Sequence, residues 1–157
     1  MVNDDQAAPE LAPESTPEPT QELAERSAKV MWSGDAASRA LGMSLDAVAP
    51  GRAVVSMAVR PDMVNGWDVC HGGLIFSLAD SSFGFACNSH NQRALAASCS
   101  IDFLAPAELG EQLTAEAIET AHAGRTRVYD VRVINQDGKL IAVFRGKSAT
   151  VKGTWVE

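Results

Sequence analysis

Two segments of the chain have the apolar pattern of helices. In the first, from Thr20 to Leu41, apolar side chains recur at helical spacing, with Leu23 and Val30 on one face and Thr20 as the N-cap. The second, residues 72–89 (GGLIFSLADSSFGFACNS), contains no Pro, is apolar on nearly every side and is long for a strand. A helix that is apolar all round has to be buried. The second segment is therefore predicted to be a buried helix.

Five other segments have the pattern of strands. Residues 52–59 alternate, with Ala53, Val55 and Met57 on one side. Four later segments are typical of strands and are separated by Pro and Gly: 94–104, 111–121, 125–135 and 139–151. The last two are joined by Gln136-Asp137-Gly138, a hairpin signal, so these four strands are expected to form an antiparallel meander. One buried helix and a long antiparallel sheet predict an α+β domain in which the sheet wraps the helix.

Composition indicates a folded domain that follows a polar leader. The chain has 157 residues, enough for one hydrophobic core. Residues 1–20 carry four of the seven prolines among Glu, Ser, Thr and Ala, and such a segment has little apolar surface to bury. We expect residues 1–20 to be a disordered acidic leader and residues 21–152 to form a single domain.

Charge and the lengths of apolar runs argue against several classes of protein. Residues 1–25 hold seven acidic side chains and no Lys or Arg, so the net charge of −7 lies there and the other 132 residues carry 13 charges of each sign. A neutral domain argues against a nucleic-acid partner. No apolar run approaches the roughly 18–20 residues of a membrane span, and the amino terminus lacks the pattern of a secretory signal. Three cysteines without CxxC spacing fit a reducing compartment, so we expect a cytoplasmic protein.

One carboxylate lies in the middle of the apolar helix. Asp80 sits between Ala79 and Ser81, where a charge is costly unless it is paired or hydrogen-bonded. Burial raises the pKa of such a group and hydrogen-bond donors lower it, which is how a general base is tuned. Two interpretations stay open: Asp80 is a general base, or it is a structural residue satisfied by Ser77, Ser81 or a subunit contact.

The start of the helix offers a second chemical group. Cys70-His71-Gly72-Gly73 precedes the apolar run, and its glycines let the backbone approach a ligand closely. Free N–H groups at a helix N-terminus are suited to a developing oxyanion. Gly72 and Asp80 are about 12 Å apart along one helix axis, too far to act on one carbon. If both are catalytic, two copies of the chain have to pack these helices antiparallel, with Asp80 of one copy facing Gly72 of the other.

Three segments resemble PaaI-like acyl-CoA thioesterases of the hotdog-fold superfamily. The longest is MVNGWDVCHGGLIFSLADSSFGFACNS (63–89), and similarity continues in SIDFLAPA (100–107) and in GRTRVYDVRVINQDGKLIAVFRG (124–146). The resemblance covers about residues 23–150. It implies a hotdog fold, in which a curved antiparallel sheet wraps a long central helix.

The resemblance also implies catalytic roles. Asp80 matches the catalytic carboxylate, which acts as general base on water or as nucleophile, and Gly72 matches the glycine whose N–H polarises the thioester carbonyl. Asn65 matches an asparagine that positions the thioester or the water, and His71 supports the thioester end of the site. Family members are homodimers that pair into tetramers, with active sites at the subunit interface. We therefore expect a homodimer that completes the site, and a homotetramer.

A further set of residues is expected to bind substrate. Trp67 stands where close relatives commonly have His, and its indole narrows the acyl pocket. CoA phosphates require Arg or Lys, and Arg125 and Arg127 fall on one face of an alternating strand, although both also fit as ordinary exposed strand charges. The full set of expected substrate-binding residues is Gly73, Trp67, Ser81, Ser98, Arg125 and Arg127.

The predicted activity is hydrolysis of an (aryl)acyl-CoA, such as phenylacetyl- or hydroxyphenylacetyl-CoA, to the free acid and CoA. No cofactor is expected, because CoA is part of the substrate. Irregular spacing argues against a metal site formed by Cys70, His71, Cys87 and His90, and Cys87 and Cys99 fit as small core residues. Two alternatives are a hotdog enoyl-CoA hydratase or dehydratase that uses His71, and a non-catalytic acyl-CoA-binding protein.

Overall fold

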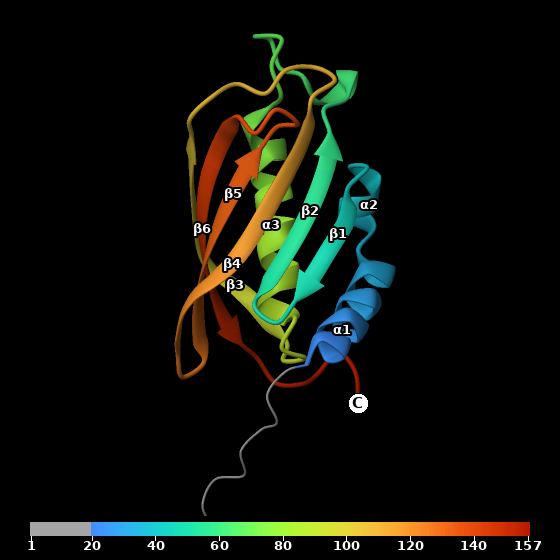
Figure 1. Cartoon of the computed structure of the whole chain (residues 1–157), viewed down its shortest axis with the longest axis vertical. Coiled ribbons are helices and arrows are strands. Elements are labelled where there is room, and N and C mark those ends of the chain that lie inside the picture. Colours follow the sequence, from blue (N-terminus) through green and yellow to red (C-terminus); the bar gives the residue numbers. More distant parts are fainter. Residues whose placement is uncertain (1–19) are drawn as a thin grey trace, which may run out of the picture.

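A six-stranded antiparallel sheet curves around one long helix in the computed structural model, which describes residues 20–157 (Figure 1). The central helix is α3 (Gly72–Asn88), as the sequence predicts. The strand order in the sheet is β1-β2-β4-β5-β6-β3, which leaves β1 and β3 at the two edges. The strands are β1 (Ser44–Ala49), β2 (Arg52–Ala58), β3 (Ala94–Phe103), β4 (Gln112–Ala123), β5 (Thr126–Ile134) and β6 (Leu140–Thr150).

The core lies between α3 and the concave face of the sheet. Alternate side chains of the strands point at the helix and are fully buried, as Val55 and Met57 of β2 illustrate. Phe83 of α3 packs edge-on against the ring of Tyr129, 5.4 Å between centroids. Its ring also lies over Gly146 of β6, where a Cβ would come within 2.8 Å of ring carbons. The absence of a side chain at Gly146 is therefore what lets the helix approach the sheet.

The N-terminal segment forms two helices instead of the single helix predicted from Thr20 to Leu41. α1 (Gln21–Gly34) is capped by Thr20, whose Oγ1 accepts from the N–H of Leu23 at 3.2 Å, and α2 (Ala36–Ala40) follows it. Asp35 separates them: its N–H donates to the carbonyl of Trp32, and its side chain accepts from the N–H of Ser38. One residue thus ends α1 and caps α2, which apolar spacing alone does not reveal.

The predicted meander is correct for β4, β5 and β6 and wrong for β3. β3 pairs with β6, with Ser100 opposite Arg145, and has no pairing with β4. The reason is that burial alternation identifies strands but does not encode which strands pair. β1 was not predicted because a bulge between Leu45 and Ala47 interrupts its alternation.

The predicted leader, residues 1–20, lies outside the described residues apart from Thr20. None of the helices within residues 20–157 combines the length and the apolar composition that crossing a membrane requires.

Candidate active site

The N-terminus of α3 presents a backbone N–H, that of Gly72, which has no acceptor among residues 20–157. The Nδ1 atom of His71 accepts from the N–H of Gly73 at 3.0 Å, which makes His71 the N-cap, and the N–H of His71 itself donates to the carbonyl of Met63. Within residues 20–157 the N–H of Gly72 donates to no protein atom. With Nδ1 accepting, Nε2 carries the proton of the neutral imidazole. The helix start therefore offers Gly72 N–H and His71 Nε2–H as donors.

An apolar pocket lies directly beside this helix start. It has a volume of about 330 Å³ and is lined by Cys70, Gly72, Ile75, Phe103 and Leu104 among others. The ring of Phe103 lies over Gly72, close enough that a Cβ on Gly72 would be 3.1 Å from its Cζ. A Cβ at that distance would force the ring to shift by a few tenths of an ångström, so glycine suits this close approach.

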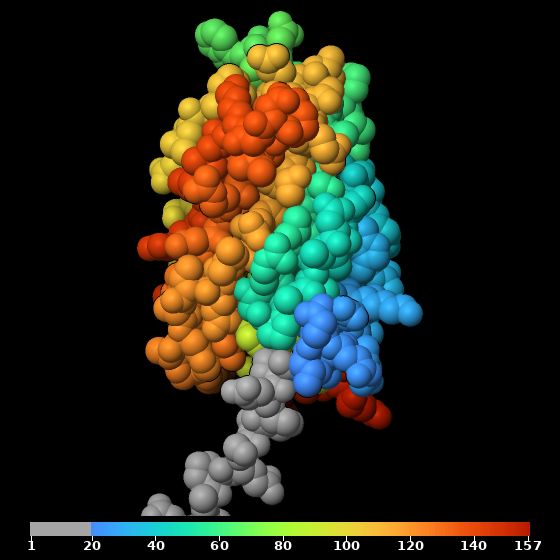
Figure 2. Space-filling view, in the orientation of Figure 1, coloured from blue at the N-terminus to red at the C-terminus, as the bar shows by residue number. Residues whose placement is uncertain are grey.

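Asn65 lies in the loop that leads into α3, and its side chain shapes that loop. Its Oδ1 accepts from the N–H of Trp67 at 2.9 Å, and its backbone carbonyl accepts from the N–H of Asp68, which has a positive φ of 58°. Trp67 is 87% exposed and does not line the pocket beside Gly72. The loop stands out from the end of the molecule as the green segment at the top of Figure 2. In a single chain, Trp67 therefore does not narrow an acyl pocket.

Asp80 lies two turns further along α3 and is half-buried. Burial raises the pKa of Asp80, and a hydrogen bond from Cys99 lowers it to a lesser extent. The distance from Cys99 Sγ to Asp80 Oδ1 is 3.8 Å, and within residues 20–157 Asp80 forms no salt bridge and accepts no other side-chain hydrogen bond. Ser77 donates to the carbonyl of Gly73 instead, and Ser81 pairs with Ser38 of α2. Neither serine satisfies the carboxylate, which favours a chemical over a structural role.

Three of the expected substrate-binding side chains lie elsewhere in a single chain. Ser98 is opposite Lys147 on the face of β3 that points away from α3. Arg127 is 13% exposed and forms an ion pair with Glu119 at 2.8 Å, while Arg125 donates Nε and Nη2 to the carbonyl of Thr150. The two arginines therefore have different surroundings, although the alternation of the strand predicted a shared face.

Cys99 is the site residue that sequence reasoning missed, since we assigned it to the core. Alternate residues of a strand share a face, and Ile101 and Phe103 therefore lie on the same face of β3 as Cys99. This face is directed toward α3. Phe103 contacts Gly72, and Cys99 precedes it by four residues in the same strand. The alternation of the strand therefore predicts that Cys99 also faces the helix.

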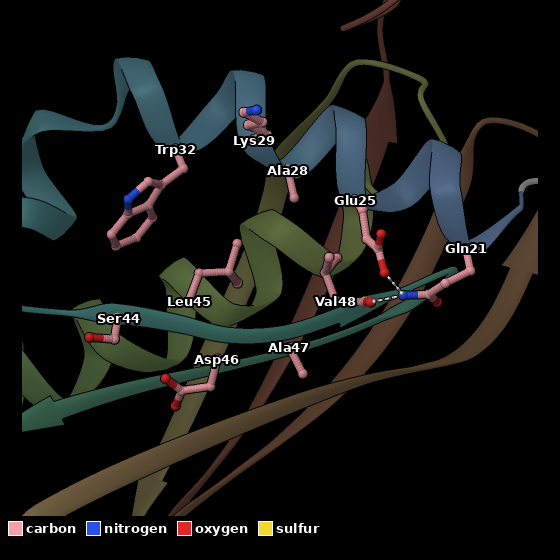
Figure 3. A pocket seen from close by; sticks show the side chains of 10 residues that line it. All are labelled: Gln21, Glu25, Ala28, Lys29, Trp32, Ser44, Leu45, Asp46, Ala47 and Val48. Carbon is pink, nitrogen blue, oxygen red and sulfur yellow. Dashed lines mark hydrogen bonds between the residues drawn. The ribbon is translucent and has the colours of Figure 1, made fainter.

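A broader groove between α1 and β1 lies far from these groups. It has a volume of about 650 Å³, with Trp32, Leu45 and Val48 at its base (Figure 3). The Nε2 atom of Gln21 donates to the carbonyl of Val48 and to Glu25, so α1 covers part of the free edge of β1. Asp80 approaches β3, at the opposite edge of the sheet, so this groove is separate from the candidate site.

The chain is similar in sequence and in fold to known thioesterases. The family model described as the thioesterase superfamily matches residues 68–142. The acyl-coenzyme A thioesterase PaaI of Escherichia coli is 46% identical over 130 residues, which cover 82% of this chain and 92% of that protein. The solved E. coli PaaI structure, from a phenylacetic acid degradation operon, superposes with a TM-score of 0.84 at 44% identity, over 86% of this chain and 98% of that one.

A second relative was solved with a ligand. The Streptococcus mutans protein bound to acetyl-CoA superposes with a TM-score of 0.69 at 25% identity, over 71% of this chain and 90% of its own. Together these likenesses define a hotdog-fold thioester hydrolase and confirm the predicted fold class. The chain belongs to the thioesterase superfamily, in its PaaI-like group.

Proposed function

We propose that the protein hydrolyses an acyl-CoA, in particular an aryl-acyl-CoA such as phenylacetyl- or hydroxyphenylacetyl-CoA, to the free acid and CoA. The observation that carries the proposal is Asp80, a half-buried carboxylate with a raised pKa and no cationic partner within residues 20–157. The similarity to an E. coli acyl-CoA thioesterase and to an S. mutans protein bound to acetyl-CoA supports CoA as the thiol. The three free thiols suit the reducing cytoplasm, where we expect the reaction.

The chemistry needs one base and one oxyanion donor. Asp80 removes a proton from water as the water oxygen bonds to the carbonyl carbon, and the N–H of Gly72 donates to the oxyanion that forms. The C–S bond then breaks, and the proton passes from Asp80 to the CoA thiolate. If Asp80 attacks the carbon itself, a mixed anhydride forms and water hydrolyses it; both routes consume one water. His71 and Asn65 orient the thioester, and we expect no metal or further cofactor.

A second copy of the chain is required to bring these two groups together. Gly72 and Asp80 are about 12 Å apart along one helix. β3 is an edge strand with an exposed apolar residue at its start, Leu95, and two at its end, Phe103 and Leu104. Antiparallel pairing of two β3 strands about a two-fold axis would pair the free sheet edge and bring the start of β3 in one copy beside its end in the other, where these apolar side chains can be covered. We expect this homodimer to pair further into a homotetramer.

The acyl group fits the apolar pocket beside Gly72. Ile75, Phe103 and Leu104 offer an aromatic and two aliphatic surfaces to an aryl ring. In the dimer, Trp67 reaches beyond its own chain, where it can narrow the partner's pocket. Arg125, whose Nη1 has no partner within residues 20–157, stays the candidate for a CoA phosphate.

Free-thiol release from phenylacetyl-, hydroxyphenylacetyl-, acetyl-, hexanoyl- and palmitoyl-CoA tests the proposal. We expect turnover of the aryl thioesters that collapses in Asp80→Asn and survives in Asp46→Asn, an exposed carboxylate of β1. Activity that persists in Asp80→Asn would remove Asp80 from the mechanism. Tight binding without turnover would indicate a binding protein, and water addition to an enoyl-CoA would indicate a hydratase.

A further inference from the structure

The thiol of Cys99 is aimed at the carboxylate of Asp80. Cys99 lies on β3 opposite Gly146, on the face of the sheet that looks toward α3, and its Sγ is 3.8 Å from Asp80 Oδ1. No other side chain within residues 20–157 donates a hydrogen bond to this carboxylate. The contact joins an edge strand to the centre of the helix, so it depends on how closely β3 approaches α3.

The Cys99 thiol stays protonated and therefore acts as a donor. Burial raises the pKa of Cys99, and the negative charge of Asp80 and the hydrogen bond to it raise it further. A thiol is a weak donor, so it orients a carboxylate while lowering its basicity less than a hydroxyl would. With Oδ1 engaged by Sγ, Oδ2 is the oxygen free to meet water or the thioester carbon.

We propose that Cys99 is a positioning residue whose thiol holds the Asp80 carboxylate through Oδ1 and leaves Oδ2 free for the reaction. This inference rests on the proposed function, because it assigns Asp80 the role of base or nucleophile.

The other titratable groups packed against α3 do not replace this contact. Cys87, on α3 itself, is close enough to be influenced by the charge of Asp80, but its thiol donates to the carbonyl of Gly84. His90 and Arg127 both bond to Glu119, beyond the C-terminal end of α3. Of the described titratable groups, Cys99 alone both faces Asp80 and donates to it.

The test compares Cys99→Ala and Cys99→Ser, which change the donor in opposite ways. In full-length protein, the pKa of the Asp80 carboxyl is measured by 13C NMR titration, with Asp80→Asn to assign the signal. We expect the pKa to rise in Cys99→Ala, which removes the donor, and to fall in Cys99→Ser, where the Asp80 side chain closes on the shorter C–O bond and the hydroxyl donates more strongly than a thiol. The acidic limb of kcat/KM against pH should move in the same two directions, with KM little changed.

The matched control is Ser100→Ala, one residue further along β3 on the opposite face of the sheet. It should leave both the titration and the pH profile unchanged. An Asp80 pKa that is the same in wild type, Cys99→Ala and Cys99→Ser would overturn the positioning role, even if Asp80→Asn were inactive. Opposite pKa shifts in a protein that hydrolyses no thioester would uphold the coupling of Cys99 to Asp80 and overturn the thioesterase proposal alone.

Discussion

The ring of Phe103 lies over Gly72 so closely that a Cβ on this glycine would be 3.1 Å from Cζ. Phe103 ends the edge strand β3, and Gly72 is the first residue of α3. The contact therefore sets the distance between the sheet edge and the helix start, while the N–H of Gly72 has no acceptor of its own within residues 20–157. The size of the side chain at position 72 and the presence of its backbone N–H can therefore be changed by separate substitutions.

Gly72→Pro removes the N–H, and Gly72→Ala keeps it but adds a Cβ. Proline suits the first position of a helix, and His71 before it has an extended backbone (φ −61°, ψ 129°) that tolerates a following proline. If the N–H is the oxyanion donor, Gly72→Pro should lower kcat/KM by about 10² to 10³-fold. Gly72→Ala should lose far less, roughly tenfold or under, through displacement of Phe103. Thiol-release kinetics on folded variants measure both, and equal losses would argue that steric blocking explains the effect.

Mixed dimers decide whether Asp80 and Gly72 act across an interface. Co-expressed Gly72→Pro and Asp80→Asn chains should recover about a quarter of wild-type activity, because half of the dimers are mixed and each has one intact site. Differently tagged chains allow the mixed dimer to be isolated and assayed against each homodimer. A site contained in one chain would give no recovery at all.

An α+β domain with a buried helix could be predicted because residues 72–89 are apolar on nearly every side, and the resemblance to PaaI-like thioesterases implied the hotdog fold. The place of β3 beside β6 could not be predicted, since alternation determines which face of a strand is buried but not which strand lies next to it. Two features of the candidate site are local and visible in the sequence: the glycines at the start of the helix and the isolated charge of Asp80. The surroundings of Arg127 were not predictable, because its partner Glu119 lies eight residues away across a bulged hairpin.

Asp80 should cost the protein stability at neutral pH. Burial raises the pKa of Asp80 in the folded protein above its value near 3.8 in the unfolded chain. The protonated carboxyl therefore stabilises the folded state fully below pH 3.8, and this stabilisation is lost as the pH rises through the folded-state pKa. Asp80→Asn should therefore be at least as stable as wild type at pH 7, with the difference vanishing below about pH 4. Urea unfolding at both pH values measures this. A variant less stable by more than about 1 kcal/mol at pH 7 would mark Asp80 as structural.

His90 should make the protein sensitive to mild acid. Burial lowers its pKa, the hydrogen bond to Glu119 at 2.7 Å raises it in part, and the charge of Arg127 lowers it again. Because the pKa of His90 is lower in the folded protein than its value near 6.5 in the unfolded chain, the neutral imidazole stabilises the folded state above pH 6.5. This stabilisation is lost as the pH falls further and the imidazole is protonated. The free energy of unfolding should decrease between pH 7.5 and about pH 5.5. His90→Gln should flatten that slope, and His122→Gln, which removes only the smallest of the influences on the pKa of His90, should change it far less.

Gly146→Ala should destabilise the core, because the new Cβ would lie 2.8 Å from the ring of Phe83. That ring is held between Tyr129 and Phe144 and cannot move aside freely. Overpacking of this kind costs about 1–3 kcal/mol. Urea unfolding should show the loss at an unchanged m value, and Gly34→Ala, where nothing lies within 4 Å of the added Cβ, should change stability by under about 1 kcal/mol. Phe83→Leu combined with Gly146→Ala should cost less than the sum of the two single variants, since the smaller side chain removes the clash. Strict additivity would mean that the glycine and the ring do not limit how closely α3 approaches the sheet.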